Sequence, residues 1–294
     1  MNKILAVTLN PSIDKTILVD RLTLGAEMRA RAVRAVSGGK GVNLCRALTA
    51  LGVAADSLTL KDIMPAVEVR ENLTVVDGAG KNTRFLESGP RCSVKQWAGV
   101  EAFVLKRLRG VSLLALCGSL PPGAPVDLYS RVIESARKKG VLTALDTSGV
   151  PLAKAVKAKP WCIKPNREEA EALLNNRIRS GQALRKALQM LSDYGMTRVL
   201  LSLGEAGLAG FDGREMYYAK VPQRSGLTVG CGDVCLAGFL AGHVHGWSFE
   251  KAVRFAAAAG SANVGREVPG DISKASVVKV QKSVKMERLS YVDH

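Results

Sequence analysis

The sequence lacks the cysteine spacing of a metal site or a disulfide scaffold. Its six cysteines include no Cys-x-x-Cys pair, and only three histidines, His243, His245 and His294, accompany them. This spacing does not support a zinc site, which needs four converging ligands. The spacing of the cysteines favours free thiols in a reducing compartment. The cysteines are Cys45, Cys92, Cys117, Cys162, Cys231 and Cys235.

Long apolar runs are also missing. No stretch approaches the roughly 20 apolar residues that a membrane-spanning helix needs. The apolar segment 4–9 near the N-terminus is too short for the core of a signal peptide, and Pro11 and Asp14 follow it closely. We therefore expect a cytoplasmic protein that has no membrane partner.

Aromatic residues are scarce, with five Tyr and six Phe, and no run interleaves them with basic residues. The sequence therefore shows no stacking platform for single-stranded nucleic acid. The formal charge is nevertheless +16. Because the basic residues are spread over 29–34, 137–139 and 154–159, they favour solvated faces and an anion-attracting field over a nucleic-acid stripe.

The segments that are present alternate between strand-like and helix-like patterns. This alternation predicts an α/β fold, a doubly wound and mostly parallel sheet flanked by helices. A chain of 294 residues, 47% hydrophobic, suits one such domain with a small appendage. The expected strands are 4–9, 111–117, 141–145, 161–163 and 199–203, and the expected helices are near 95–109, 125–139, 166–174 and 180–195.

Two further segments, 15–36 and 67–87, have a different pattern of apolar and polar residues. Apolar and polar residues alternate there with a period of two, and Asp77-Gly78 with Gly80 marks a hairpin turn. The pattern predicts a small antiparallel sheet laid over one edge of the core. After Val221 the chain is expected to turn helical.

The run from Thr228 to Asp233 combines a Gly-Cys-Gly turn with the start of an apolar helix. Such a start leaves backbone N–H groups unpaired, and the helix dipole makes them attractive to anions. Asp233 would lie at the mouth of that anion site, where a carboxylate can take a proton from an attacking hydroxyl. A helix-capping Asp with two turn glycines is the structural alternative.

Six motifs occur in an order that resembles the PfkB (ribokinase-like) family of carbohydrate kinases, and within it the phosphohexose branch. Asn-Pro-Ser-Ile-Asp together with Gly-Ser-Leu-Pro-Pro-Gly favours that branch. The resemblance implies a single kinase domain over 1–294 with a β lid from about 15–36 and 67–90. The motifs are Thr8 to Asp14, Gly38 to Asn43 running into Arg46 to Gly52, Gly118 to Gly123, Lys164 to Glu169, Ser202 to Gly207, and Thr228 to Asp233.

The resemblance also implies a sugar-phosphate site. Asp14 follows a strand at the carboxyl edge of the sheet, where its carboxylate can accept hydrogen bonds from sugar hydroxyls, although a plain turn Asp is the alternative. Arg70 resembles the guanidinium that grips the phosphate. The implied substrate-binding residues are Asp14, Gly38, Gly39, Lys40, Asn43, Arg70 and Ser119, with Arg29 nearby.

On the nucleotide side, the resemblance implies that Asn166 and Glu169 organise Mg²⁺ and its waters on the phosphates of ATP. Capping alone also explains Asn166. Asp233 would act as the base, with the backbone of Gly230, Cys231 and Gly232 forming the anion hole. Cys231 replaces the family's usual alanine there, which a hole made of backbone N–H groups tolerates. The implied ATP-binding residues are Lys164, Asn166, Ser202, Gly204, Gly207 and Asn263.

The segment between Gly52 and Arg70 departs from the family. It is too short for a strand, a turn and a helix of ~10 residues, so a core element is expected to be missing. Glu27 also stands where some relatives carry a phosphate-binding Lys.

The sequence predicts an ATP-dependent phosphohexose kinase. Fructose 1-phosphate is the first-choice acceptor, and tagatose 6-phosphate and fructose 6-phosphate are the alternatives. The other class of function is an inactive kinase-like protein that binds a nucleotide or a nucleic acid. A homodimer through the lid is expected, with Val33, Val69 and Leu73 near the contact, because one face of so small a sheet would otherwise stay uncovered.

Overall fold

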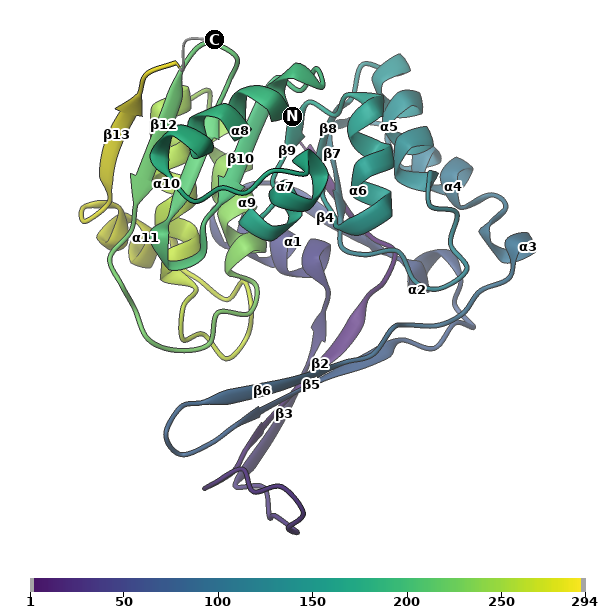
Figure 1. Cartoon of the computed structure of the whole chain (residues 1–294). Helices are drawn as coiled ribbons and strands as arrows, with labels where there is room; N and C mark the ends of the chain where they lie inside the picture. The colour runs from purple at the N-terminus through teal and green to yellow at the C-terminus, as the bar shows by residue number, and fades with distance from the viewer. Residues whose placement is uncertain (1–2, 292–294) are drawn as a thin grey trace.

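The computed structural model describes residues 3–291, which form two β-sheets and the helices around the larger one (Figure 1). The large sheet has the strand order β13-β12-β11-β10-β9-β8-β7-β1-β4. Neighbours from β4 to β10 are parallel, and β11 to β13 add antiparallel pairs at the other edge. Its strands are β1 Lys3–Thr8, β4 Ala55–Thr59, β7 Val111–Cys117, β8 Leu142–Asp146, β9 Cys162–Ile163, β10 Arg198–Ser202, β11 Leu208–Phe211, β12 Met216–Lys220 and β13 Lys285–Leu289.

Helices cover both faces of this sheet, which is why its central strands are apolar on both sides. In β1, Leu5 and Val7 belong to one buried cluster, whereas Ile4 and Ala6 belong to another. The first cluster lies under α4 Val100–Lys106, α5 Leu128–Lys138, α6 Gly149–Ala155, α7 Arg167–Leu174 and α8 Gly181–Asp193. The second lies under α1 Lys40–Ala50, α9 Cys231–Val244, α10 Phe249–Ala262 and α11 Lys274–Gln281. The predicted doubly wound α/β fold is confirmed.

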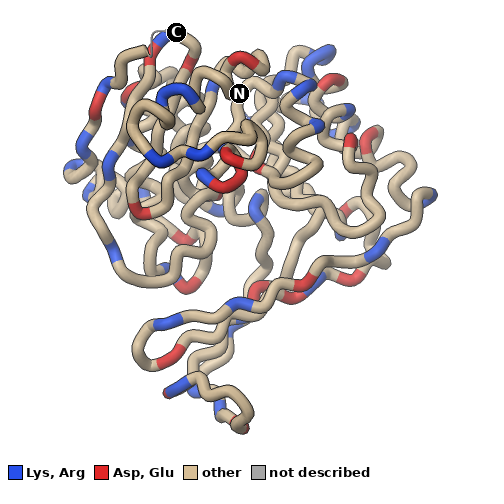
Figure 2. The backbone as a smooth tube through the Cα atoms, in the orientation of Figure 1, with Lys and Arg blue, Asp and Glu red and all other residues tan. Residues whose placement is uncertain are grey.

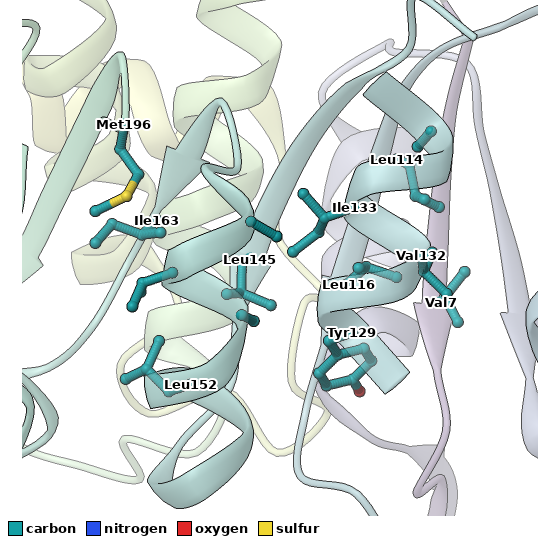
Figure 3. Packing of buried hydrophobic residues seen from close by; sticks show 14 of the residues in the cluster. Val7, Leu114, Leu116, Tyr129, Val132, Ile133, Leu145, Leu152, Ile163 and Met196 are labelled. Carbon is teal, nitrogen blue, oxygen red and sulfur yellow. The ribbon is translucent and has the colours of Figure 1, made fainter. Parts of the chain in front are cut away.

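Figure 3 shows how the first cluster packs. Tyr129 and Ile133 of α5 lie against the strand that carries Leu116, and all three side chains are 1% exposed or less. The Tyr129 hydroxyl donates to the carbonyl of Gly118 at 3.1 Å. The contact therefore anchors the end of β7 at the edge of the sheet where ligands bind in such folds.

Helix α9 is apolar around its whole circumference because α1 and α10 enclose it. A Cβ added at Gly238 would lie 2.8 Å from the Cβ of Ala259, so α9 and α10 approach each other closely. This packing holds the N-terminus of α9 firmly at the carboxyl edge of the parallel strands.

The small sheet has the order β3-β2-β5-β6 and projects from that same edge (Figure 1), and Figure 2 shows that its strands carry both basic and acidic residues. Its strands are β2 Ser12–Leu18, β3 Ala32–Gly38, β5 Arg70–Val76 and β6 Asn82–Leu86. The small lid sheet is present as predicted, but it is mixed rather than antiparallel, because β2 and β5 are parallel. Both strands leave the body in the same direction, and β3 and β6 return antiparallel to them.

The short segment after Gly52 holds strand β4 and only one helical turn, α2 Leu60–Ile63. No ten-residue helix occurs there, as expected, and β4 pairs with β1 at the edge of the large sheet. The single helix predicted near 95–109 was wrong: it is divided into one turn, α3 Val94–Trp97, and α4, because Gly99 between them has a left-handed backbone conformation with φ +96°. The chain after Val221 is helical as predicted, but it ends in the unpredicted strand β13. Over residues 3–291, no helix has both the length and the apolarity to cross a bilayer.

Candidate active site

A cavity of about 730 Å³ lies between the carboxyl edge of the sheet, the root of the lid and the start of α9. Lid residues and nucleotide-side residues line this one cavity, although Asp14 and Asp233, for example, lie 219 positions apart in the chain. The sequence-predicted residues among its lining are Asp14, Gly39, Lys40, Asn43, Arg70, Lys164, Asn166, Glu169, Ser202, Gly204, Gly207 and Gly230 to Asp233.

Four predicted residues do not line it. Ser119 accepts a hydrogen bond from the Asn10 side chain at 3.1 Å, and Gly38 lies against the Asp14 carboxylate. Arg29 is exposed between β2 and β3. Asn263 is fully buried, where it donates to the Val229 carbonyl at 2.8 Å and accepts from a backbone amide at 2.8 Å, so it braces the turn before α9.

The N-terminus of α9 forms the floor of the cavity. Gly230 has φ +76°, and a Cβ there would lie 2.5 Å from Pro269, so the turn requires glycine. In a helix that begins at Cys231, the amides of Gly232 and Asp233 have no helical acceptor. Their N–H groups and the helix dipole together make a binding site for an anion.

Asp233 is only 6% exposed, and its Oδ2 accepts a hydrogen bond from Asn43 Nδ2 at 2.9 Å. Burial, together with the nearby Asp146 carboxylate, raises the pKa of Asp233 to about 7, although Lys40 and Lys164 act in the opposite direction. A carboxylate with a pKa near neutrality is suited to accept a proton from an alcohol during transfer.

Asp146, at the end of β8, is a site residue that the sequence analysis missed. Its carboxylate is 1% exposed and binds Lys40 Nζ at 2.8 Å and Lys164 Nζ at 3.0 Å. Burial acts to raise the pKa of Asp146, but Lys164 and Lys40 outweigh it and hold that pKa below its usual value. The position of Asp146 at the carboxyl end of a predicted strand was the available signal.

The Lys164 ammonium lies against the anion-binding turn. The two are so close that a Cβ added at Gly232 would be 3.2 Å from Lys164 Nζ. Although burial disfavours its charged form, the adjacent Asp146 raises the pKa of Lys164 above its usual value. A permanent positive charge therefore stands beside the N-terminus of α9.

The lid contributes the opposite wall. Asp14 Oδ1 accepts from Ser12 Oγ at 2.7 Å and from Asn72 Nδ2 at 2.9 Å. The guanidinium of Arg70 donates to the carbonyl of Glu87 at 2.8 Å, and Arg84 lines the cavity as well. The wall thus combines a fixed carboxylate with two guanidinium groups, which suits a ligand that carries both hydroxyls and a phosphate. Asn72 and Arg84 were not predicted from the sequence.

Asn166 and Glu169 form a reciprocal capping box at the start of α7. Asn166 Oδ1 accepts from the Glu169 amide at 2.8 Å, and Glu169 Oε2 accepts from the Asn166 amide at 2.9 Å. No cluster of three or more His, Cys, Asp or Glu residues able to hold a metal occurs within residues 3–291. The oxygen-only pair still fits Mg²⁺, which keeps several waters and binds through one or two carboxylates and the phosphates of a substrate.

An anion site at a helix start, a buried carboxylate with a near-neutral pKa and a lid with two guanidiniums define a phosphotransferase that has an alcohol group as acceptor. The sequence profile described as pfkB family carbohydrate kinase matches residues 68–275. The chain belongs to this family.

Two curated relatives and a group of solved structures are similar over most of the chain. The ATP-dependent 6-phosphofructokinase isozyme 2 of Escherichia coli K12 is 31% identical, over 89% of this chain and 92% of its own length. A tagatose-6-phosphate kinase of Staphylococcus epidermidis is 26% identical, over 96% and 99%. Structures of phosphofructokinase-2 from E. coli, including a complex with fructose-6-phosphate and a tetrameric inhibited form, are 28% identical, with a TM-score of 0.86 over 96% and 99%.

Proposed function

We propose that this ATP-dependent phosphohexose kinase transfers the γ-phosphoryl group of ATP to a ketohexose monophosphate and forms a 1,6-bisphosphate. The observation that carries the proposal is the single cavity in which Asp233 at the start of α9 faces the lid residues Asp14 and Arg70. The cavity thus brings an anion site, a base and a sugar-phosphate wall together, which a transfer between two phosphorylated substrates requires.

Fructose 6-phosphate is the first-choice acceptor. The two curated relatives described above are named for 6-phosphate sugars. Fructose 1-phosphate, the first choice from the sequence, is the second candidate, because the motifs Asn10 to Asp14 and Gly118 to Gly123 favour the phosphohexose branch as a whole and do not separate the two acceptors. Both acceptors yield the same bisphosphate, so they differ in which end of the sugar faces Asp233.

In the proposed reaction, Arg70 and Arg84 bind the phosphate of the sugar, and Asp14 binds its hydroxyls. Asp233 accepts the proton as the acceptor oxygen bonds to the γ-phosphorus and the bond to the bridging oxygen of ADP breaks. The amides of Gly232 and Asp233 stabilise the charge on the transferred group.

Lys164 holds a positive charge beside those amides. Asn166 and Glu169 would hold the water shell of Mg²⁺, which supplies charge neutralisation on the phosphates of ATP. The proposal therefore assigns the sugar to the lid and the nucleotide to the side of α7 and α9.

A screen of acceptors tests the function. ADP release is measured with fructose 6-phosphate, fructose 1-phosphate, tagatose 6-phosphate and ribose. We expect the highest kcat/KM with fructose 6-phosphate and no turnover with ribose, since ribose has no phosphate for Arg70 and Arg84. ATP binding without ADP release for any of the four sugars would instead favour the inactive nucleotide binder.

A homodimer through the lid is also proposed. In the strand register, Asp14 and Asn72 are paired and both line the cavity, so the alternate residues occupy the opposite face. That face carries Ile17, Val33, Leu73 and Phe85, and Val33 and Phe85 are each 57% exposed. Apart from the Lys15–Glu71 ion pair, this face is largely apolar, and such a face on so small a sheet suits a second copy of the chain.

Substitution of charge on this face tests the dimer. We expect wild type at micromolar concentration to sediment at twice the mass of one chain, and Val33→Glu combined with Phe85→Glu to sediment as a monomer. Val150→Glu, on α6, is the control, because Val150 is also 57% exposed but lies on the body. A monomeric wild type that turns over its sugar would contradict the proposal.

A further inference from the structure

Arg46 on α1 does not line the cavity, yet its guanidinium binds three oxygens from three segments. Nη1 donates to Asn43 Oδ1 at 3.2 Å and also to the carbonyl of Pro269, in the loop after α10. Nη2 donates to the carbonyl of Ser37 at 2.8 Å, and Ser37 is the penultimate residue of the lid strand β3. One side chain thus joins the root of the lid, the loop after α10 and a residue of the site.

Asn43 passes this contact on to Asp233. Its side chain is buried, with Oδ1 held by Arg46 and Nδ2 donating to Asp233 Oδ2 at 2.9 Å. A carboxamide can present either its oxygen or its NH₂ group to a neighbour. Because a guanidinium has donors only, the group that faces Arg46 must be the oxygen, and the NH₂ group then faces the carboxylate.

We infer that Arg46 is a positioning residue for phosphoryl transfer, because it holds the Asn43 carboxamide in the one orientation that donates to Asp233. The inference rests on the proposed function, in which Asp233 accepts the proton. Arg46 acts through Asn43 and touches neither substrate.

Without Arg46, the Asn43 carboxamide is free to turn its oxygen toward Asp233. A carboxylate has no proton to donate to that oxygen, whereas a protonated Asp233 does. The turned amide therefore stabilises the protonated form, in which Asp233 cannot act as a base. Loss of Arg46 is expected to weaken activity at low pH and to spare it at high pH.

The other charged and titratable groups around Asp233 stay in place when Arg46 is replaced. They come from the elements packed against the start of α9 and from α9 itself: Lys40 on α1, Cys117 on β7, Asp146 on β8, Lys164 after β9, and Cys231. Arg46 hydrogen-bonds to none of them. A change in the titration of Asp233 in an Arg46 variant can therefore be attributed to the Asn43 amide.

The geometry also explains why arginine is needed. The three acceptors lie around a planar fork, which the guanidinium can reach simultaneously, whereas the ammonium of lysine is a single point. Arg46→Lys is expected to hold the Asn43 carboxamide in its orientation part of the time, whereas Arg46→Gln is expected not to hold it.

The test is the dependence of kcat on pH for wild type, Arg46→Gln and Arg46→Lys at saturating substrates. We expect the acid limb of Arg46→Gln to move upward by about one pH unit, with about tenfold lower kcat below that limb and recovery at high pH. Arg46→Lys should move less. ATP affinity should stay within about twofold of wild type, because Arg46 lies outside the cavity.

Arg131→Gln is the matched control. Like Arg46, Arg131 donates to three oxygens through its guanidinium, one of Glu101 and both of Asp127, but it lies on α5 away from the site. The acid limb of this variant should coincide with that of wild type. An Arg46→Gln enzyme whose acid limb is unmoved would overturn the inference, whether kcat is normal or is lowered equally at every pH.

A second measurement needs no turnover. The ¹³C carboxyl titration of Asp233, assigned with Asp233→Asn, should show the same upward shift in Arg46→Gln or, if that variant does not fold, a smaller one in Arg46→Lys. An unshifted titration in a folded variant rejects the inference. If the wild type releases no ADP with any sugar phosphate, but the Asp233 titration is still shifted in Arg46→Gln, only the proposed function is rejected.

Discussion

Asp233→Asn is expected to lower kcat by at least ~10²-fold, the effect typical of losing a positioned base. ATP binding should persist, because the amides at the start of α9 and the Lys164 ammonium do not depend on the carboxylate. Steady-state kinetics and calorimetric titration with ATP measure the two quantities. Turnover near the wild-type rate would show that Asp233 is not the base.

The same substitution is expected to stabilise the ligand-free protein. In the unfolded chain Asp233 loses its proton near pH 4, whereas in the fold its pKa is raised to about 7. Between these values the folded state holds the extra proton, so wild-type stability falls as pH rises through this window. The Tm advantage of Asp233→Asn should therefore grow from pH 4 to pH 7 and then level off. A Tm difference between the variant and wild type that stays constant with pH would mean that burial does not raise the pKa of Asp233.

Asp146→Asn is expected to destabilise the fold by about 3–5 kcal/mol, the usual cost of removing one partner from a buried ion pair. The carboxylate is 1% exposed, and Lys164, which is 4% exposed in its side chain, would lose its counter-charge. Chemical denaturation of the ligand-free protein at pH 7 measures the loss. The lysines hold the pKa of Asp146 below its usual value. The contribution of the Asp146 carboxylate to the free energy of unfolding is therefore complete above about pH 4. It is lost as pH falls through the lower pKa of the folded state.

Asp56→Asn is the control for this experiment. Asp56 pairs with Lys3 at 2.6 Å, but both side chains are at least 41% exposed. An exposed pair of this kind contributes about 0–1 kcal/mol, so the control should lose little. Equal losses in the two variants would show that the buried carboxylate has no special structural role.

Much of the candidate site could be predicted from the sequence because its residues lie in short local motifs. The turn from Gly230 to Asp233 must leave free amides wherever a helix follows it, and the Asn166 capping box is complete within four residues. Lys164 follows the predicted strand 161–163 directly, so the carboxyl edge of a parallel sheet was its expected place. Asp14 was expected at the same edge, after the strand 4–9, but the structure places it in the lid strand β2.

The residues that were missed depend on long-range contacts. Asp146 looks like any strand-terminal Asp until Lys40 and Lys164, from two other elements, converge on it. Arg46 looks like an ordinary helical arginine until Ser37 and Pro269 supply its acceptors. Asn72 reaches Asp14 only because β5 pairs with β2 in register.

The local patterns of the sequence determined the strands β1, β7, β8, β9 and β10, most of the helices, the anion-binding turn and the family, because each of these depends on spacing within a few residues. The tertiary structure decided the parallel pairing of β2 with β5, the burial of Asp146 between two lysines and the orientation of the Asn43 amide. Charge, burial and hydrogen-bond direction at these places are set by neighbours that are distant in the chain. Only the folded arrangement of the sheet, the lid and α9 brings those neighbours together.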